Sequence, residues 1–269
     1  MRPAQARGGR RGDRCRREAR AVNAAALPHF LATPHALALG VWTILTASLV
    51  LLGRRLRATP RALSWDRAVG VVACICWLGV NTYWLWPPVR WEQALPLQLC
   101  DLAAMMAWLA LLTGLRLCRA LLYFWAFALS SQGFVTPITR EGPDHPEFWA
   151  HWINHGAILA AAVYDVAVLR FRPTRRDLIL AVGVSLGYVA LMVPLNIATG
   201  WNYGYVGPDL PESTTILDRL GPWPLRIVWV CLLGALAMVA VYLPWELARV
   251  IGLSRGHSRF TSSSGTAAE

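Results

Sequence analysis

Seven apolar segments dominate this sequence, and each is close to the ~20 residues that a helix needs to cross the hydrocarbon core of a bilayer. With 56% hydrophobic and only 15% charged residues over 269 positions, the chain is too apolar for an ordinary soluble domain. We therefore expect an all-α fold, a polytopic membrane helical bundle with seven transmembrane helices. The predicted spans lie at roughly 33–53, 67–87, 94–115, 118–138, 149–170, 177–198 and 223–250.

The chain divides into one membrane domain and two polar tails. Residues 27–252 contain all seven predicted spans. Residues 1–26 carry eight arginines and too few apolar residues to form a core, so we expect a disordered tail. A start codon assigned too far upstream would also account for this segment. Residues 253–269 are expected to form a disordered cytoplasmic tail.

Arginines set the predicted orientation in the membrane. They gather in the loops after the first, third and fifth spans, whereas each alternate loop carries one. By the positive-inside rule the arginine-rich loops are cytoplasmic, which places the C-terminus inside and the N-terminus outside; only residues 1–26 go against this. The same distribution accounts for the net charge of +11 without a nucleic-acid partner. All 26 basic residues are arginine, which indicates a high-GC bacterial genome and therefore a bacterial inner membrane.

Polar side chains concentrate in the outer half of the predicted bundle. His151, Asn154 and His155 are spaced to lie together on the fifth span, and Cys100 enters the membrane on the third span to a similar depth. The inner halves of the same spans are nearly pure hydrocarbon. Because polar groups are expensive in a bilayer unless they are paired or used, this asymmetry predicts a cavity that opens outward.

A cysteine beside a histidine offers a specific chemistry. The thiolate of Cys100 would act as a nucleophile and His155 as a general base, the combination that transfers acyl groups through a thioester. Asn154, Gln98 or Gln132 could donate hydrogen bonds to the oxyanion that forms on the way. Asp101 follows the cysteine directly, points about 100° away on a helix, and is better placed to orient a partner.

Other interpretations of these residues stay open. The histidine pair could simply bond neighbouring helices, and Cys100 could be one more small apolar residue. His151 and His155 could instead bind zinc or iron, but no motif fixes a third ligand among Cys100, Asp101, Asp144 and His145, so we expect neither a metal nor another cofactor.

Two further classes of function remain. A transporter or receptor would bind a small polar ligand in the same outward cavity, although the apolar inner halves argue against a pathway to both faces. A purely structural membrane subunit predicts that the polar cluster is tightly paired and that no cavity exists.

Four short motifs, in this order, resemble a known group of proteins. They are Leu95-Pro96-Leu97-Gln98-Leu99-Cys100-Asp101, the helix that carries His155, Asn202-Tyr203-Gly204-Tyr205, and Gly221-Pro222-Trp223-Pro224. Together they resemble the YwaF-type bacterial integral membrane family, which looks related to eukaryotic transmembrane protein 164, a membrane acyltransferase that acts on phospholipids. The resemblance covers about residues 30 to 250.

The resemblance implies a seven-helix fold with a thiol on the third helix and an imidazole on the fifth. Cys100 would be the acyl-accepting nucleophile and His155 the base, while Gln98 stands where many bacterial members have histidine. The implied function is a lipid-acting thiol acyltransferase or hydrolase, with membrane lipids as partners and an acyl lipid as substrate. The residues expected to contact the substrate are Gln98, Asp101, Gln132, His151, Asn154, Asn202 and Tyr203.

Overall fold

The computed structural model describes residues 33–135, 142–209 and 216–263, and throughout these ranges the regular structure is helical. The predicted tail at residues 1–26 lies outside the described residues, as do the last six positions of the chain. The final helix, α10, runs from Leu225 to Ser263, past the predicted end of the seventh span.

Five helical segments are long and apolar enough to cross a membrane. They are Pro34–Leu56, Ala62–Trp84, Trp91–Thr113, Arg175–Thr199 and Leu225–Ile251. These correspond to the predicted first, second, third, sixth and seventh spans. The all-helical membrane fold is therefore confirmed, whereas the count of seven transmembrane helices stays a prediction.

The predicted fourth and fifth spans are helical but differ from the other five. The fifth is α8 (Pro146–Ala167), a continuous helix of 22 residues that carries several polar side chains. The fourth is divided into α6 (Arg116–Phe124), the π-helix η2 (Trp125–Ser130) and α7 (Gln132–Val135). Both are largely buried inside the bundle, so protein rather than lipid surrounds them and they need not be uniformly apolar.

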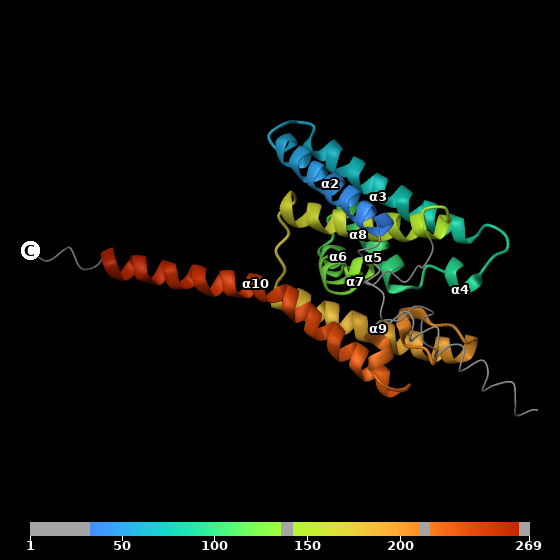
Figure 1. The fold of residues 1–269 in the computed structure, drawn as a ribbon. Coiled ribbons are helices and arrows are strands. Elements are labelled where there is room, and N and C mark those ends of the chain that lie inside the picture. Colours follow the sequence, from blue (N-terminus) through green and yellow to red (C-terminus); the bar gives the residue numbers. More distant parts are fainter. Residues whose placement is uncertain (1–32, 136–141, 210–215, 264–269) are drawn as a thin grey trace, which may run out of the picture.

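The helices form a central group between two outer pairs (Figure 1). One outer pair is α2 (Thr33–Leu56) with α3 (Ala62–Trp84), and the other is α9 (Arg175–Thr199) with α10. Between them α5 (Leu99–Thr113) packs against α3, α6 and α8, and η2 packs against α10. The outer pairs expose their leucines, isoleucines and valines, as the lipid-facing helices of a membrane bundle do.

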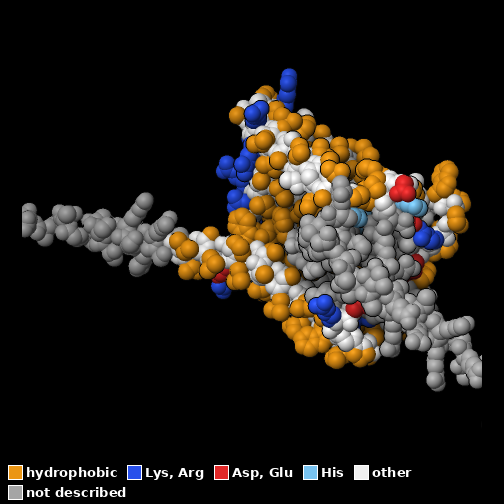
Figure 2. Space-filling view, in the orientation of Figure 1, with side chains coloured by type: hydrophobic (Ala, Val, Ile, Leu, Met, Phe, Trp, Pro, Cys, Tyr) orange, Lys and Arg blue, Asp and Glu red, His pale blue; other side chains and the backbone are white. Residues whose placement is uncertain are grey.

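Several ion pairs lie at one end of the bundle, which we call the arginine end, and Arg90 pairs with Glu147 at the other. Figure 2 shows arginine side chains clustered there, over the ends of α2 and α3. The pairs are Arg57 with Asp66, Arg116 with Asp177, Arg119 with Asp165, and Arg175 with Glu246. They tie together the loops that the sequence predicts to be cytoplasmic, and the histidines of α8 lie toward the opposite end.

Candidate active site

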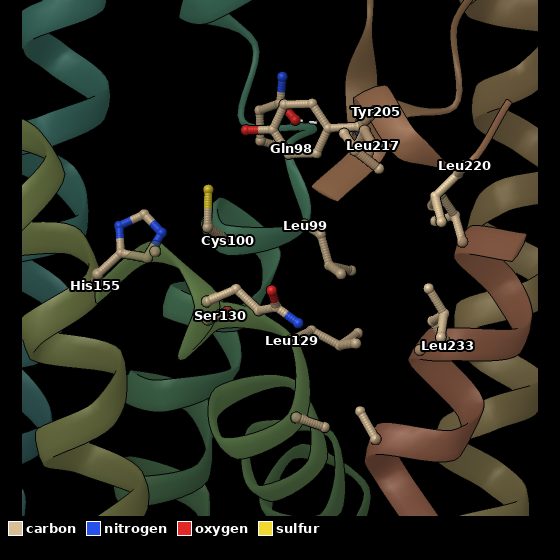
Figure 3. Close-up of a pocket in the computed structure, with 17 residues that line it drawn as sticks. Gln98, Leu99, Cys100, Leu129, Ser130, His155, Tyr205, Leu217, Leu220 and Leu233 are labelled. Carbon is tan, nitrogen blue, oxygen red and sulfur yellow. Dashed lines mark hydrogen bonds between the residues drawn. The ribbon is translucent and has the colours of Figure 1, made fainter. Parts of the chain in front are cut away.

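A cavity of about 350 Å³ lies between the central helices and α10 (Figure 3). Its polar lining residues are Gln98, Cys100, Ser130, Gln132, His155 and Tyr205. Its apolar lining residues are Leu99, Ala128, Leu129, Leu217, Leu220, Val230, Leu233 and Ala237. The volume falls within the range of small-molecule sites. Because polar groups on the central helices face an apolar wall on α10, the cavity suits an amphiphilic ligand.

The third predicted span is interrupted immediately before Cys100. The short helix α4 (Trp91–Ala94) ends, Leu95 and Gln98 are extended, and α5 begins afresh at Leu99. Pro96 explains the interruption, because proline lacks an amide hydrogen and disfavours helical backbone in the residue before it. Cys100 is therefore the second residue of a helix rather than the middle of one.

The start of α5 presents unpaired hydrogen-bond donors. The carbonyl oxygen of Gln98 accepts from the N–H groups of Asp101 and Leu102, at 3.0 and 3.1 Å. Among the described residues, the N–H groups of Leu99 and Cys100 have no acceptor. The thiol thus sits at the N-terminal end of a 15-residue helix, the end at which the helix dipole is positive.

Asp101 connects the cysteine to α8. Its Oδ1 accepts a hydrogen bond from Nδ2 of Asn154 at 3.1 Å and lies 3.9 Å from the Cys100 sulfur, which donates to it. The indole N–H of Trp77 donates to the carbonyl oxygen of Asp101 at 3.1 Å. Because Asn154 is buried and directly precedes His155, these bonds hold the first turn of α5 against the turn of α8 that carries the histidine.

The ring of His155 is held in one tautomer. Its Nδ1 lies 3.0 Å from the carbonyl oxygen of His151, and since a carbonyl only accepts, Nδ1 carries the proton and Nε2 is an acceptor. The two imidazoles stack with centroids 4.3 Å apart, and Nε2 of His151 bonds the carbonyl oxygen of Gly133 at 3.1 Å. A Cβ at Gly133 would come within 2.5 Å of the His155 ring. The His155 ring therefore occupies space that a side chain at position 133 would fill, and only glycine at that position leaves it free.

The thiol and the imidazole of His155 line the same cavity from two helices, Cys100 from α5 and His155 from α8 (Figure 3). Within the described ranges no hydrogen bond joins them, since the cysteine donates to Asp101. Bonds between a nucleophile and its base are often long in ligand-free sites and shorten when substrate binds. The arrangement therefore offers a nucleophile and a base that approach one ligand.

The loop after α9 forms another wall of the cavity. The N–H of Gly204 donates to Oε1 of Gln98 at 3.1 Å, which fixes the amide side chain beside the cavity. Tyr205 also lines it, with a left-handed backbone conformation (φ 59°). Burial raises the pKa of Tyr205 above the usual tyrosine range, so its hydroxyl stays protonated and can donate at neutral pH.

Other residues predicted to contact a substrate do not line the cavity. Asn202 bonds the N–H of Gly207 and the carbonyl oxygen of Asp209, each at 2.9 Å, and so folds its own loop. Tyr203 is fully buried, and its backbone pairs with the side chain of Asn196. Asp101, His151 and Asn154 lie behind the lining residues and touch or position them.

The sequence did not single out three residues of the site. Tyr205 stands beside Asn202 and Tyr203 in the same motif, so its place could have been inferred from that neighbourhood. Gly133 follows Gln132, but only the approach of the His155 ring reveals its role. Ser130 ends the π-helix η2, and π-helical turns are frequent at functional sites, yet no sequence signal marks this one.

A metal centre finds no support in this arrangement. No group of three or more His, Cys, Asp or Glu side chains is placed to hold an ion anywhere in the described part of the chain. His151 and His155 instead stack on each other, and each has a ring nitrogen bonded to a backbone carbonyl oxygen.

Comparison with known proteins identifies the family. Residues 30–242 match the TMEM164 family, and this match contains every residue that lines the cavity. The chain belongs to the TMEM164 family. No curated protein and no solved structure gives a significant match. This TMEM164-family chain is therefore a membrane protein with several apolar helices, and the predicted relation to transmembrane protein 164 is confirmed; its place in the YwaF-type bacterial branch stays a prediction.

Proposed function

We propose that this TMEM164-family protein is a lipid-acting thiol acyltransferase or hydrolase. The Cys100 sulfur attacks the carbonyl carbon of a lipid ester, and the thiol proton passes to Nε2 of His155. The imidazole returns that proton to the leaving alcohol as the C–O bond breaks, which leaves the acyl group on sulfur as a thioester. An acceptor hydroxyl or water then attacks the thioester, gives its proton to His155, and releases the product; the imidazole reprotonates the thiol.

The observation that carries this proposal is the position of Cys100 at the open start of α5. The unpaired N–H groups of Leu99 and Cys100 and the helix dipole would stabilise the oxyanion that forms when the sulfur attacks. Gln98 and Gln132 line the same cavity and are further candidate donors to the oxyanion or the ligand. The proposed reaction uses no cofactor.

Supporting residues have distinct proposed roles. Asp101 orients the thiol and, through Asn154, the turn that carries His155. His151 positions the imidazole by accepting from its Nδ1 and by stacking on it. Tyr205, in the loop after α9, donates to polar groups of the lipid.

Two features weigh against the alternative readings. A purely structural subunit predicted a fully paired polar cluster without a cavity, whereas this cluster borders about 350 Å³ of open space. A transporter needs a path to both faces, but ion pairs such as that of Arg119 with the buried Asp165 occupy the arginine end of the bundle. Uptake of a small polar solute into vesicles, with no covalent intermediate, would favour transport over catalysis.

The test of catalysis is acylation of the cysteine. Purified protein in vesicles that contain a fluorescent phospholipid should acquire a hydroxylamine-sensitive label on Cys100. Cys100→Ala should abolish the label, and His155→Ala should slow its formation about 10²–10⁴-fold, the range typical of a general base. If the rate survives His155→Ala but falls in Asp101→Asn, the base assignment is wrong.

A thiol probe provides the matched control. A small alkylating reagent should modify Cys100 faster than the other described cysteines, because among them only Cys100 lines the main cavity together with His155. Those cysteines are Cys74, Cys76, Cys118 and Cys231. Equal modification of all five would contradict the proposed activation of Cys100.

The location proposed for the protein is a bacterial inner membrane. The arginine end would face the cytoplasm, so that the C-terminus lies inside, the N-terminus outside, and the cavity on the outer side. The arginine-only basic composition and the YwaF-like motifs support this proposal. Fusion of a reporter to each terminus would test it.

A further inference from the structure

A second, smaller cavity lies beside the one that Cys100 lines. It has a volume of about 100 Å³, lies between α9 and α10, and we call it the α9–α10 slot. It shares five lining residues with the main cavity, namely Leu99, Leu129, Gly204, Val230 and Gly234. The two spaces are therefore neighbours, and these five residues lie between them.

The walls of the slot are mostly apolar, and their exceptions are Ser185, Tyr188 and the thiol of Cys231. Most are aliphatic, such as Val182, Val189 and Met238. The two hydroxyl groups present already donate within the protein, Ser185 to the carbonyl oxygen of Ala181 and Tyr188 to that of Leu97, each at 2.8 Å. An apolar chain fits such walls because it leaves no buried group unpaired.

The slot also borders the surface that faces lipid. Leu186 on α9 is 49% exposed and lines the slot, and Leu233 on α10 is 38% exposed and lines the main cavity. On α9 the lining residues run from Val182 to Val189, about 10 Å of helix at 1.5 Å per residue. The slot thus leads away from the polar groups along the helix axes, as the tail of a lipid does when its headgroup lies at the membrane surface.

Gly234 stands where the two cavities meet. A Cβ there would lie 3.5 Å from Cδ2 of Leu129, so a larger side chain would project into the passage between them. Gly187 on α9 provides a matched control, because a Cβ at that position meets nothing within 4 Å.

We infer that the α9–α10 slot binds the acyl chain of the lipid ester whose carbonyl carbon reaches Cys100, and that Gly234 keeps the entrance open. This inference rests on the proposed function for the identity of the ester, but occupancy of the slot by a lipid chain can be measured without turnover. The substrate class that follows is a lipid with at least one long aliphatic acyl chain.

The test uses a phosphatidylcholine that carries a photoreactive diazirine within its acyl chain, in vesicles with the Cys100→Ala protein. Crosslinks should map to residues 182–189 and 230–238. Gly234→Leu should reduce them about tenfold, since loss of contact with even two methylene groups has roughly that effect on affinity. Gly187→Leu should leave them unchanged. Leu186→Trp, which narrows the slot from α9, should reproduce the loss if Gly234→Leu folds poorly.

The outcomes separate the two proposals. Crosslinks confined to the lipid-exposed faces of α2 and α3, or unaffected by both slot variants, would overturn the acyl-chain inference. Crosslinks in the slot, together with the absence of any hydroxylamine-sensitive label on Cys100 in the parent protein, would retain the slot and overturn the acyl transfer. In an active parent, Gly234→Leu should slow acylation by long-chain esters and spare short-chain esters, and an equal effect on both would also contradict the slot.

Discussion

Gly133→Ala should disable the site through one methyl group. The new Cβ would lie 2.5 Å from Cδ2 and 2.7 Å from Nε2 of His155, so the ring must move by about 1 Å to restore an ordinary contact. It cannot retreat freely, because Nδ1 is bonded to the carbonyl oxygen of His151 and the two imidazoles are stacked. A displacement of about 1 Å at a reacting group costs on the order of 10²-fold in rate. We therefore expect acylation of Cys100 to slow about 100-fold.

The fold should survive this substitution, which makes the loss interpretable. Alanine is favoured over glycine inside a helix by roughly 0.5–1 kcal/mol, and Gly133 lies within α7. This gain offsets part of the ~1–3 kcal/mol expected from overpacking, so the protein should remain folded.

The assay is the rate of hydroxylamine-sensitive labelling of Cys100 from a fluorescent phospholipid, with thermal unfolding in detergent measured in parallel. Gly79→Ala and Gly183→Ala are the controls, because a Cβ at either position meets nothing within 4 Å. A Gly133→Ala protein that acylates at the parent rate would refute the placement of His155 as the base at this cavity.

The remaining predictions concern the arginine end and the loop at the opposite end. Arg119→Leu should destabilise the protein by about 3–5 kcal/mol, because it leaves the buried Asp165 without its partner. Adding Asp165→Leu to the same chain should restore most of that loss. Thermal unfolding of the single and double variants measures both effects, and additive losses would contradict the coupling between the two residues. Burial, and then the Glu92 carboxylate, raise the pKa of Tyr203 from 10.0 to about 12. The contribution of this hydroxyl to the free energy of unfolding is therefore fully present below pH 10 and should be lost as the pH rises toward 12. Unfolding midpoints measured across this pH range should fall less in Tyr203→Phe than in the parent.

Much of the fold could be predicted from apolar length alone. Five of the seven predicted spans correspond to helices that are long and apolar enough to cross a membrane, since a bilayer imposes this requirement on any lipid-facing helix. The fourth and fifth spans are less certain from sequence because they lie inside the bundle. There, neighbouring helices replace lipid, and α8 can carry Asn154, His155 and Asp165 without exposing them to hydrocarbon.

The depth of the site in the membrane could be predicted from the sequence, but the direction of its side chains could not. Equal depth on two helices placed Cys100 and His155 at the same level, and both line the cavity. Side-chain direction in the loop after α9 was not predictable, because Tyr203 is held by hydrogen bonds to Asn196 of α9 while Tyr205 faces the cavity. The predicted third span at 94–115 ran through Pro96, although proline chemistry favours the break that places Cys100 at the start of α5.

The interrupted third span also couples the stability of the bundle to hydration. Backbone N–H groups that find no acceptor cost several kcal/mol each in hydrocarbon, so the amides of Leu99 and Cys100 require water or a ligand oxygen at membrane depth. If the proposed function is correct, the carbonyl oxygen of the lipid ester displaces that water when it enters the cavity. The chain thus requires a hydrated site at membrane depth. A substitution that joined α4 and α5 into one continuous helix would pair these two N–H groups within the helix. Both the need for water and the two free donors would then be lost.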